Sequence, residues 1–155
     1  MHEFINLKGR ICIRRYPKET TYEDIRDGRR IGEVIEERDN LIVTAGKQHL
    51  LDTMISTTTD NFDYVGVGSG TTAAAVGQTN LVYPMLRNQC SDRWRSNITD
   101  YFSAFFSSSQ ANGPWEEAGL FRDASGGVMF SRSLFASSWT KTSNDVAVCE
   151  WSISF

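Results

Sequence analysis

The strongest constraint on the fold is an alternation of apolar and polar side chains with a period of two residues. It is clearest in the last ten residues, VAVCEWSISF (146–155). Successive side chains of a β-strand point to opposite faces of the sheet, so this pattern predicts a strand with one buried side. On the buried side we expect Ala147, Cys149, Trp151, Ile153 and Phe155, and on the solvent side Glu150, Ser152 and Ser154.

Shorter runs of the same kind recur between residues 60 and 137. They are DYVGV (63–67), NLVYP (80–84), ITDYFSAFFSS (98–108), WEEAGLF (115–121) and VMFSRSLFAS (128–137). The last two flank RDASGG (122–127), in which Gly126 and Gly127 tolerate the positive φ angles of a hairpin turn. Closely spaced strands joined by turns predict a mainly β fold, with an antiparallel β-sandwich or jelly-roll-like body over residues 41–155.

One segment follows a helical period instead. Residues 45–56 predict a short amphipathic helix, the only one we expect, with Thr44 as its N-cap. Its apolar stripe consists of Leu50, Leu51, Met54 and Ile55. His49 lies beside this stripe, where we expect a partly buried structural histidine rather than a ligand or a catalyst.

The first 40 residues differ from the rest in charge. They carry nine Lys or Arg and nine Asp or Glu, so nearly half of the segment is charged although its net charge is zero. Ile11 and Ile13 alternate with polar neighbours, and RRIGEVIEE (29–37) is the candidate partner strand. Residues 1–40 are therefore predicted to form a charged N-terminal arm or hairpin attached to the β body.

Composition excludes several classes of function. The formal net charge of −3 and the pI of about 5.4 give no basic surface for nucleic acid. No run approaches the roughly 18 apolar residues of a membrane span, and the start, MHEFINLKGR, does not resemble a secretory signal. The chain has three cysteines, Cys12, Cys90 and Cys149, which lie far apart in the sequence. An odd number at this spacing indicates free thiols in a reducing cytoplasm rather than disulfides or a zinc site.

The stretch GSGTTA (68–73) matches G-x-G-x-x-A, a permissive form of the dinucleotide-binding turn. A true site needs a full helix after the glycines and a return to a parallel strand. Here Gly77 and Pro84 leave room for two helical turns at most, and antiparallel alternation follows. We therefore expect a flexible structural loop and no nucleotide, cofactor or metal.

Catalysis is not expected either. Nucleophilic Ser, Thr or Cys needs a base within hydrogen-bonding distance, and the sequence offers only His2 and His49. Glu116 and Glu117 are adjacent on a predicted strand and point to opposite faces, which suits neither pair of glycosidase carboxylates. The sequence thus predicts a protein that is not an enzyme.

Several short motifs occur in a recognisable order. They are NLIVTAGKxxLL (40–51), YVGVGSGTTAAAVGQTNLV (64–82), WEEAGLF (115–121), GGVMFSR (126–132), KT (141–142) and WSISF (151–155). This order resembles a family of tailed-bacteriophage virion proteins, and most closely the N-terminal module of phage tail-collar fibre proteins. That module has a helix start, a V-G-x-G strand, a Q-T-x-L segment and an E-x-G-L-F strand in the same order. Of the N-E-V-x-R that follows Q-T-x-L there, Arg87 is the residue that matches.

The resemblance covers residues 40–155 and implies a structural protein of the virion, assembled in the cytoplasm of the bacterial host. Two locations are open: the tail or collar, as an adaptor or fibre-attachment piece, and the capsid, as a decoration protein. A long shaft follows the module in the fibre proteins, whereas this sequence stops, which favours a stand-alone accessory protein. The expected partners are other copies of the chain, a trimer being one such assembly, and other virion proteins.

The EEAGLF segment also has a physical interpretation of its own. Leu120 and Phe121 are expected to be buried, and Gly119 to allow another backbone or ring to approach closely. Glu116 or Glu117 can pair with Arg132 on the adjacent strand. The alternative is a plain core strand with solvated glutamates.

The candidate interface residues are Trp94, Trp139, Arg14, Arg15 and Tyr16. Trp94 and Trp139 stand in polar, loop-like surroundings and suit subunit contacts. The three others belong to the charged arm, which we expect to reach across a subunit boundary. A second hypothesis is a carbohydrate-binding module that stacks a host surface glycan on Trp94, Trp139 and Tyr83.

Overall fold

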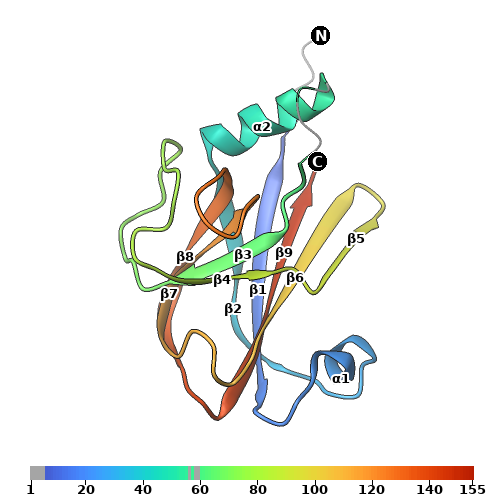
Figure 1. The fold of residues 1–155 in the computed structure, drawn as a ribbon, viewed down its shortest axis with the longest axis vertical. Coiled ribbons are helices and arrows are strands. Elements are labelled where there is room, and N and C mark those ends of the chain that lie inside the picture. Colours follow the sequence, from blue (N-terminus) through green and yellow to red (C-terminus); the bar gives the residue numbers. More distant parts are fainter. Residues whose placement is uncertain (1–5, 56, 58–59) are drawn as a thin grey trace.

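The structure is a computed structural model that describes residues 6–55, 57 and 60–155. This part of the chain holds two helices and nine strands (Figure 1). In chain order they are β1 (Lys8–Pro17), α1 (Tyr22–Arg26), β2 (Glu33–Ile42), α2 (Thr44–Met54), β3 (Tyr64–Gly68), β4 (Pro84–Gln89), β5 (Asp92–Ser96), β6 (Thr99–Phe106), β7 (Gly113–Phe121), β8 (Met129–Lys141) and β9 (Asp145–Ser154). His2, the first five residues of the predicted arm and the last residue of the helix predicted over 45–56 lie outside the described ranges.

All nine strands belong to one antiparallel sheet, in the order β4-β3-β7-β8-β2-β1-β9-β6-β5. The sheet curls because β2 changes partner along its length. Residues 33–40 of β2 pair with β1, whereas Leu41 and Ile42 pair with Arg132 and Ser131 of β8. The mainly β, antiparallel prediction is confirmed, but one continuous curled sheet does not confirm a sandwich or a jelly roll.

The curl brings the two ends of the sheet together. The side chain of Asn88 in β4 donates a hydrogen bond of 2.8 Å to the carbonyl of Phe105 in β6. Just beyond β4, the amide of Ser91 donates one of 2.7 Å to the carbonyl of Ser103. The sheet therefore surrounds its own core, in which Trp115 and Trp151 are the largest fully buried side chains.

The last strand shows how far the alternation holds. Ala147, Cys149 and Trp151 are fully buried, as predicted from VAVCEWSISF. Ile153 is only half-buried, and Phe155 is 60% exposed, so its predicted place in the core is wrong. Phe155 lies beyond the end of β9, which is Ser154.

From residue 8 on, the charged N-terminal segment forms two paired strands of the sheet. β1 pairs with β2, as the sequence suggested for 11–15 and 29–37. On its other edge β1 pairs with β9 over ten residues, from Lys8 with Ser154 to Pro17 with Asp145. Ile11 and Ile13 are consequently fully buried near the middle of the sheet, and the sheet has no boundary at residue 40.

The helices differ from prediction in three respects. A second helix, α1, begins at a capping box in which Thr21 and Asp24 bond each other's amides. The N-cap of α2 is Val43 rather than Thr44. Leu51, Met54 and Ile55 are 60–74% exposed, because α2 lies on the sheet through Gly46 and His49 instead.

Candidate functional site

A buried ion pair joins β7 and β8 on the side of the glycine-rich loop. Glu117 and Arg132 are both fully buried, and Arg132 Nε donates a hydrogen bond of 2.8 Å to Glu117 Oε2, while Nη2 lies 2.8 Å from the same oxygen as an ion-pair contact. Arg132 lies opposite Gly119, so Glu117 is its diagonal neighbour on the same face of the sheet. The predicted pairing of a glutamate with Arg132 is confirmed, for Glu117 rather than Glu116.

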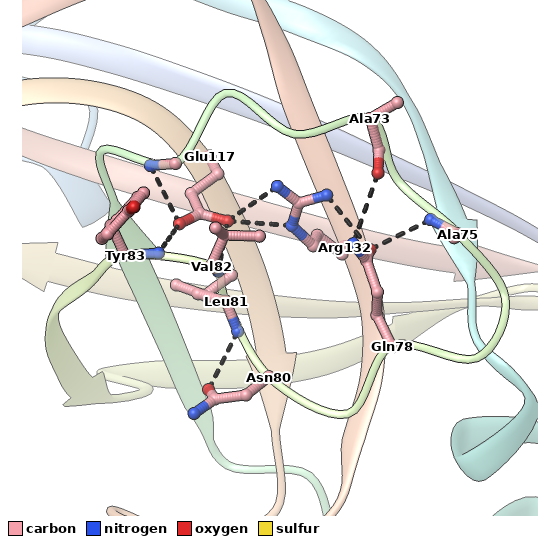
Figure 2. A network of polar contacts seen from close by, with 10 residues as sticks. Ala73, Ala75, Gln78, Asn80, Leu81, Val82, Tyr83, Glu117 and Arg132 are labelled. Carbon is pink, nitrogen blue, oxygen red and sulfur yellow. Dashed lines mark hydrogen bonds and ion pairs between the residues drawn. The ribbon is translucent and has the colours of Figure 1, made fainter.

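The glycine-rich loop, residues 69–83, binds the same carboxylate through its backbone (Figure 2). The amides of Gly70 and Tyr83 donate to Glu117 Oε1 at 3.0 and 2.7 Å, and the amide of Val82 donates to Oε2 at 3.0 Å. A Cβ on Gly70 would overlap Oε1 and lie 2.7 Å from the Cβ of Val82. The amides that a dinucleotide-binding loop would direct at a phosphate are thus directed at the protein's own glutamate.

The sequence predicts a strand over NLVYP (80–84), and this prediction is wrong for residues 80–83. The contact with Glu117 explains why. The amides of Val82 and Tyr83 are used by Glu117 and are not free to enter a strand ladder. Strand β4 begins at Pro84, after these two residues. The preceding segment is held as a loop by a side chain more than 30 residues away.

Gln78 completes the polar cluster from the other side of Arg132. Its Oε1 accepts from Arg132 Nη1 at 3.1 Å and from the amide of Ala75 at 3.0 Å, and its Nε2 donates to the carbonyl of Ala73 at 3.3 Å. We call Glu117, Arg132 and Gln78 the loop anchor. Figure 2 shows the loop wrapped around it.

A second contact fixes the far side of the loop. The guanidinium carbon of Arg87 lies 3.5 Å from the centroid of the Phe121 ring, while its nitrogens donate to Asn80 Oδ1 and to the carbonyls of Asp123 and Gly126. Gly66 makes room for this stack, since a Cβ there would lie 2.9 Å from the Phe121 ring. Burial lowers the pKa of Arg87, and the charge of Asp123 partly opposes this shift.

The surface of this loop carries no charge. Residues 64–86 contain no Lys, Arg, Asp or Glu, and most of residues 71–80 are exposed, among them Thr71, Thr72, Ala75 and Val76. The carbonyl of Val76 accepts from the amide of Thr44, which ties the loop to the start of α2. The result is a small-residue, uncharged surface whose backbone is held by buried ionic hydrogen bonds.

A groove of about 790 Å³ opens at another part of the molecule, between α2 and the β5–β6 hairpin. We call it the end groove. One wall is made by His49, Leu50 and Thr53 of α2, and the other walls and the floor include Phe62, Trp94, Ile98, Tyr101, Phe102, Phe130, Ile153 and Phe155. Both arginines of its lining form ion pairs, Arg93 with Asp63 at 3.3 Å and Arg95 with Asp100 at 2.6 Å.

His49 has the structural role that the sequence suggested. It is 6% exposed, its Nε2 lies 3.1 Å from the carbonyl oxygen of Asp60, and its ring meets Phe62 edge-on at 5.0 Å. Both contacts hold the segment that leads into β3 against α2. The imidazole is therefore used in packing one wall of the groove.

The predicted interface tryptophans lie in strands, not in loops, and in different places. Trp94 of β5 is 40% exposed and stacks on Tyr101 at 5.0 Å with nearly parallel rings. Trp139 of β8 is half-buried and packs edge-on against Trp115 at 5.1 Å. Trp94 alone of the two lies at the end groove.

The three candidate residues of the charged segment are engaged within the chain. Arg15 pairs with Asp145 at 2.8 Å and with Glu33 at 3.4 Å. Tyr16 is 4% exposed, and burial raises the pKa of its hydroxyl. Arg14 is half-buried and lowers the pKa of Glu150, which burial raises more strongly. These contacts suit a packed hairpin better than an arm that crosses to another subunit.

The cysteines and the acids offer little chemistry. Burial raises the pKa of Cys90 to about 12 and also raises the pKa of Cys12 and Cys149, so all three stay protonated near neutrality. Within the described ranges, no cluster of three or more His, Cys, Asp or Glu side chains is arranged to hold a metal ion. In the same ranges no helix is long and apolar enough to cross a membrane.

The candidate-site residues that the sequence analysis did not single out are Gln78 and Tyr101. Gln78 bonds to Arg132, 54 residues away, whereas Tyr101 is the cross-strand neighbour of Trp94 in the β5–β6 hairpin. No protein-family model matches the chain, and comparisons with characterised proteins and with solved structures gave no significant match.

Proposed function

We propose that this chain is a non-enzymatic structural component of a tailed-phage virion, an accessory protein of the tail or collar or of the capsid surface. One observation carries the proposal: the motifs that resemble the tail-collar module meet in one cluster. Gly66 and Gly68 come from V-G-x-G, Gln78 from Q-T-x-L, Glu117 and Gly119 from E-x-G-L-F, and Arg132 from GGVMFSR. Fifty-four residues separate Gln78 from Arg132, yet the two are hydrogen-bonded.

The chemistry of the cluster favours a structural role over a catalytic one. Both carboxylate oxygens of Glu117 are used by loop amides or by Arg132, so the carboxylate holds the backbone and does not face solvent. A loop fixed in this way loses little conformational entropy when it meets another surface. The cluster therefore supports a building block that presents a preorganised, uncharged loop to a neighbouring virion protein.

The test is to locate the chain in particles. Tailed-phage particles made from the genome that encodes this chain are purified, and the chain is quantified in them by mass spectrometry and located by cryo-electron microscopy. We expect a fixed number of copies per particle, on the tail and collar or on the capsid surface. Purified particles that lack the chain would contradict the proposal.

A matched pair of loop variants links this test to the cluster. Gly70→Ala disturbs the loop anchor, and we expect fewer copies of that variant on the particle. Gly77→Ala changes the same loop where, among the described residues, an added Cβ meets no heavy atom within 4 Å. We expect Gly77→Ala to be incorporated like the natural chain.

A second candidate function is recognition of a host surface glycan at the end groove. The observation in its favour is the Trp94–Tyr101 stack on the groove wall, next to the polar rim of Arg93, Arg95 and Asp100. The predicted trio of stacking residues is reduced to Trp94, since Trp139 packs on Trp115 and Tyr83 belongs to the loop. Glycan titration followed by tryptophan fluorescence tests it: Trp94→Ala should abolish the response, and Trp139→Ala should not.

A further inference from the structure

Exposed apolar side chains concentrate at the end of the molecule that holds α2. Figure 1 places α2, the end of β9 and the tip of the β5–β6 hairpin at this same end. Six large apolar residues are 40–74% exposed here: Leu51, Met54, Ile55, Trp94, Ile98 and Phe155. Leu51 and Met54 stand on α2, Ile55 is its C-cap, and the other three line the end groove.

The exposed apolar area at this end is similar to the area that one partner buries in a stable protein interface. Large apolar side chains present on the order of 200 Å² each, so these six expose roughly 700 Å² together. The largest apolar patch of an ordinary monomer is about 300–600 Å². A stable protein interface buries about 800 Å² on each partner. The α2 end therefore exposes about as much apolar surface as one side of a stable contact.

One half of this surface is a helical ridge, and the other is a groove. At the C-terminal end of α2, Leu51, Met54 and the C-cap residue Ile55 follow the i, i+3, i+4 spacing by which a helix enters an apolar groove. Next to them the same chain has an apolar groove of about 790 Å³, open to solvent. A chain that carries both a helical ridge and a groove can supply both sides of a contact between copies.

Charge does not oppose this arrangement. The groove is lined by two cations, Arg93 and Arg95, and two anions, Asp60 and Asp100. The exposed face of α2 carries one charge of each sign, Lys47 and Asp52. Neither surface repels a second copy by an excess of one sign.

We infer that the end groove of one copy binds the outer face of α2 from a second copy, and that this contact builds a homo-oligomer. The inference rests on the proposed function, because it specifies how a virion building block meets its own copies. The same contact closes a pair or a ring, depending on the angle between copies.

The experiment uses two complementary variants and a control. The helix variant is Leu51→Asp with Ile55→Asp, the groove variant is Ile98→Asp, and the control is Ile31→Asp, which alters a 96% exposed residue between α1 and β2. Size-exclusion chromatography with light scattering follows assembly over a concentration series, and circular dichroism checks that each variant is folded. We expect the natural chain and the control to assemble alike, and each of the other variants to assemble about 100-fold more weakly.

Mixing gives the decisive result. The helix variant keeps an intact groove and the groove variant keeps an intact helix, so an equimolar mixture retains one unaltered contact and should recover association. A monomeric natural chain, or an oligomer insensitive to both variants, overturns the inference, as does a mixture that fails to associate. An oligomer disrupted equally by the control also overturns it.

The outcomes separate the two proposals. A chain that is found in particles but is monomeric in solution overturns this inference and leaves the proposed function intact. A chain that assembles through α2 and the groove but is missing from purified particles overturns the proposed function and leaves the contact intact. Assembly that persists in the variants while glycan binding is lost with Trp94→Ala overturns the inference in favour of the glycan site.

Discussion

The glycine-rich loop and the α2 end are both exposed, but they are built in opposite ways. The loop presents small uncharged residues on a backbone that is fixed from below by buried ionic hydrogen bonds. The α2 end presents large apolar residues that have few contacts of their own, such as Met54 and Ile55. Internal contacts therefore specify the shape of the loop, whereas the exposed surface of the α2 end is free for an external contact.

Because the two regions are built differently, substitutions in the loop should affect stability, and substitutions on the outer face of α2 should affect association. A change beneath the loop removes interactions that the folded monomer already makes, so it lowers the free energy of unfolding. A change on the outer face of α2 removes side chains that the monomer leaves in water, so it affects assembly instead. The predictions below test this separation, starting with the largest expected loss of stability.

Arg132→Met should have the largest effect. It leaves the fully buried carboxylate of Glu117 without its cation, and breaking a buried ion pair in this way costs about 3–5 kcal/mol. The free energy of unfolding is measured by urea denaturation. The double variant Glu117→Gln with Arg132→Met should lose less, because it removes the uncompensated charge. A loss below about 1 kcal/mol in the single variant would show that the pair does not hold the loop.

Gly70→Ala should have the next largest effect. Its Cβ would overlap Glu117 Oε1, and forcing an atom into a packed site costs about 1–3 kcal/mol. Gly77→Ala in the same loop should stay within about 0.5 kcal/mol of the natural protein or be slightly more stable, since the new methyl group meets open space. Equal losses in the two variants would mean that the loop is held along its whole length and not at Glu117.

Trp94→Ala tests the groove wall. The stack on Tyr101 is partly exposed and should contribute about 0.5–1.5 kcal/mol to the free energy of unfolding. A double-mutant cycle with Tyr101→Ala isolates the contact, and the double variant should be more stable than the sum of the two single losses implies. Strict additivity would show that the two rings contribute independently.

The parts of the fold that follow from local alternation were predictable. Ala147, Cys149 and Trp151 occupy the buried side of β9, and the turn at Gly126 and Gly127 has the positive φ angles that glycine permits. The Glu117–Arg132 pair could also be predicted, because a hairpin with a short turn sets which residues of its two strands are neighbours. In each case the information lies within one strand or one hairpin.

The parts that failed depend on distant segments. The spacing of Leu50, Leu51, Met54 and Ile55 identified an apolar side of α2 but not which side meets the sheet. That is decided by Gly46, where a Cβ would lie 2.7 Å from the Cα of Phe130 and prevent the close approach. Similarly, Val82 and Tyr83 have the composition of a strand, and only the carboxylate of Glu117 keeps them in a loop. Gln78 belongs to the Q-T-x-L motif of the resemblance, but no local pattern indicated its role, since its partner is 54 residues away.

Leu51→Ala should have the smallest effect on stability, and it completes the comparison. Leu51 is 60% exposed on a helix, and alanine favours the helix slightly more than leucine does, so we expect a change within about 0.5 kcal/mol. The matched control is Leu120→Ala, the same substitution at a fully buried position of β7, which should cost about 2–5 kcal/mol. Urea denaturation of dilute protein, below the concentration at which copies associate, measures both. A large loss at Leu51 in the monomer would show that α2 is packed through its outer face after all, and that the helix is part of the core rather than a surface for a second copy.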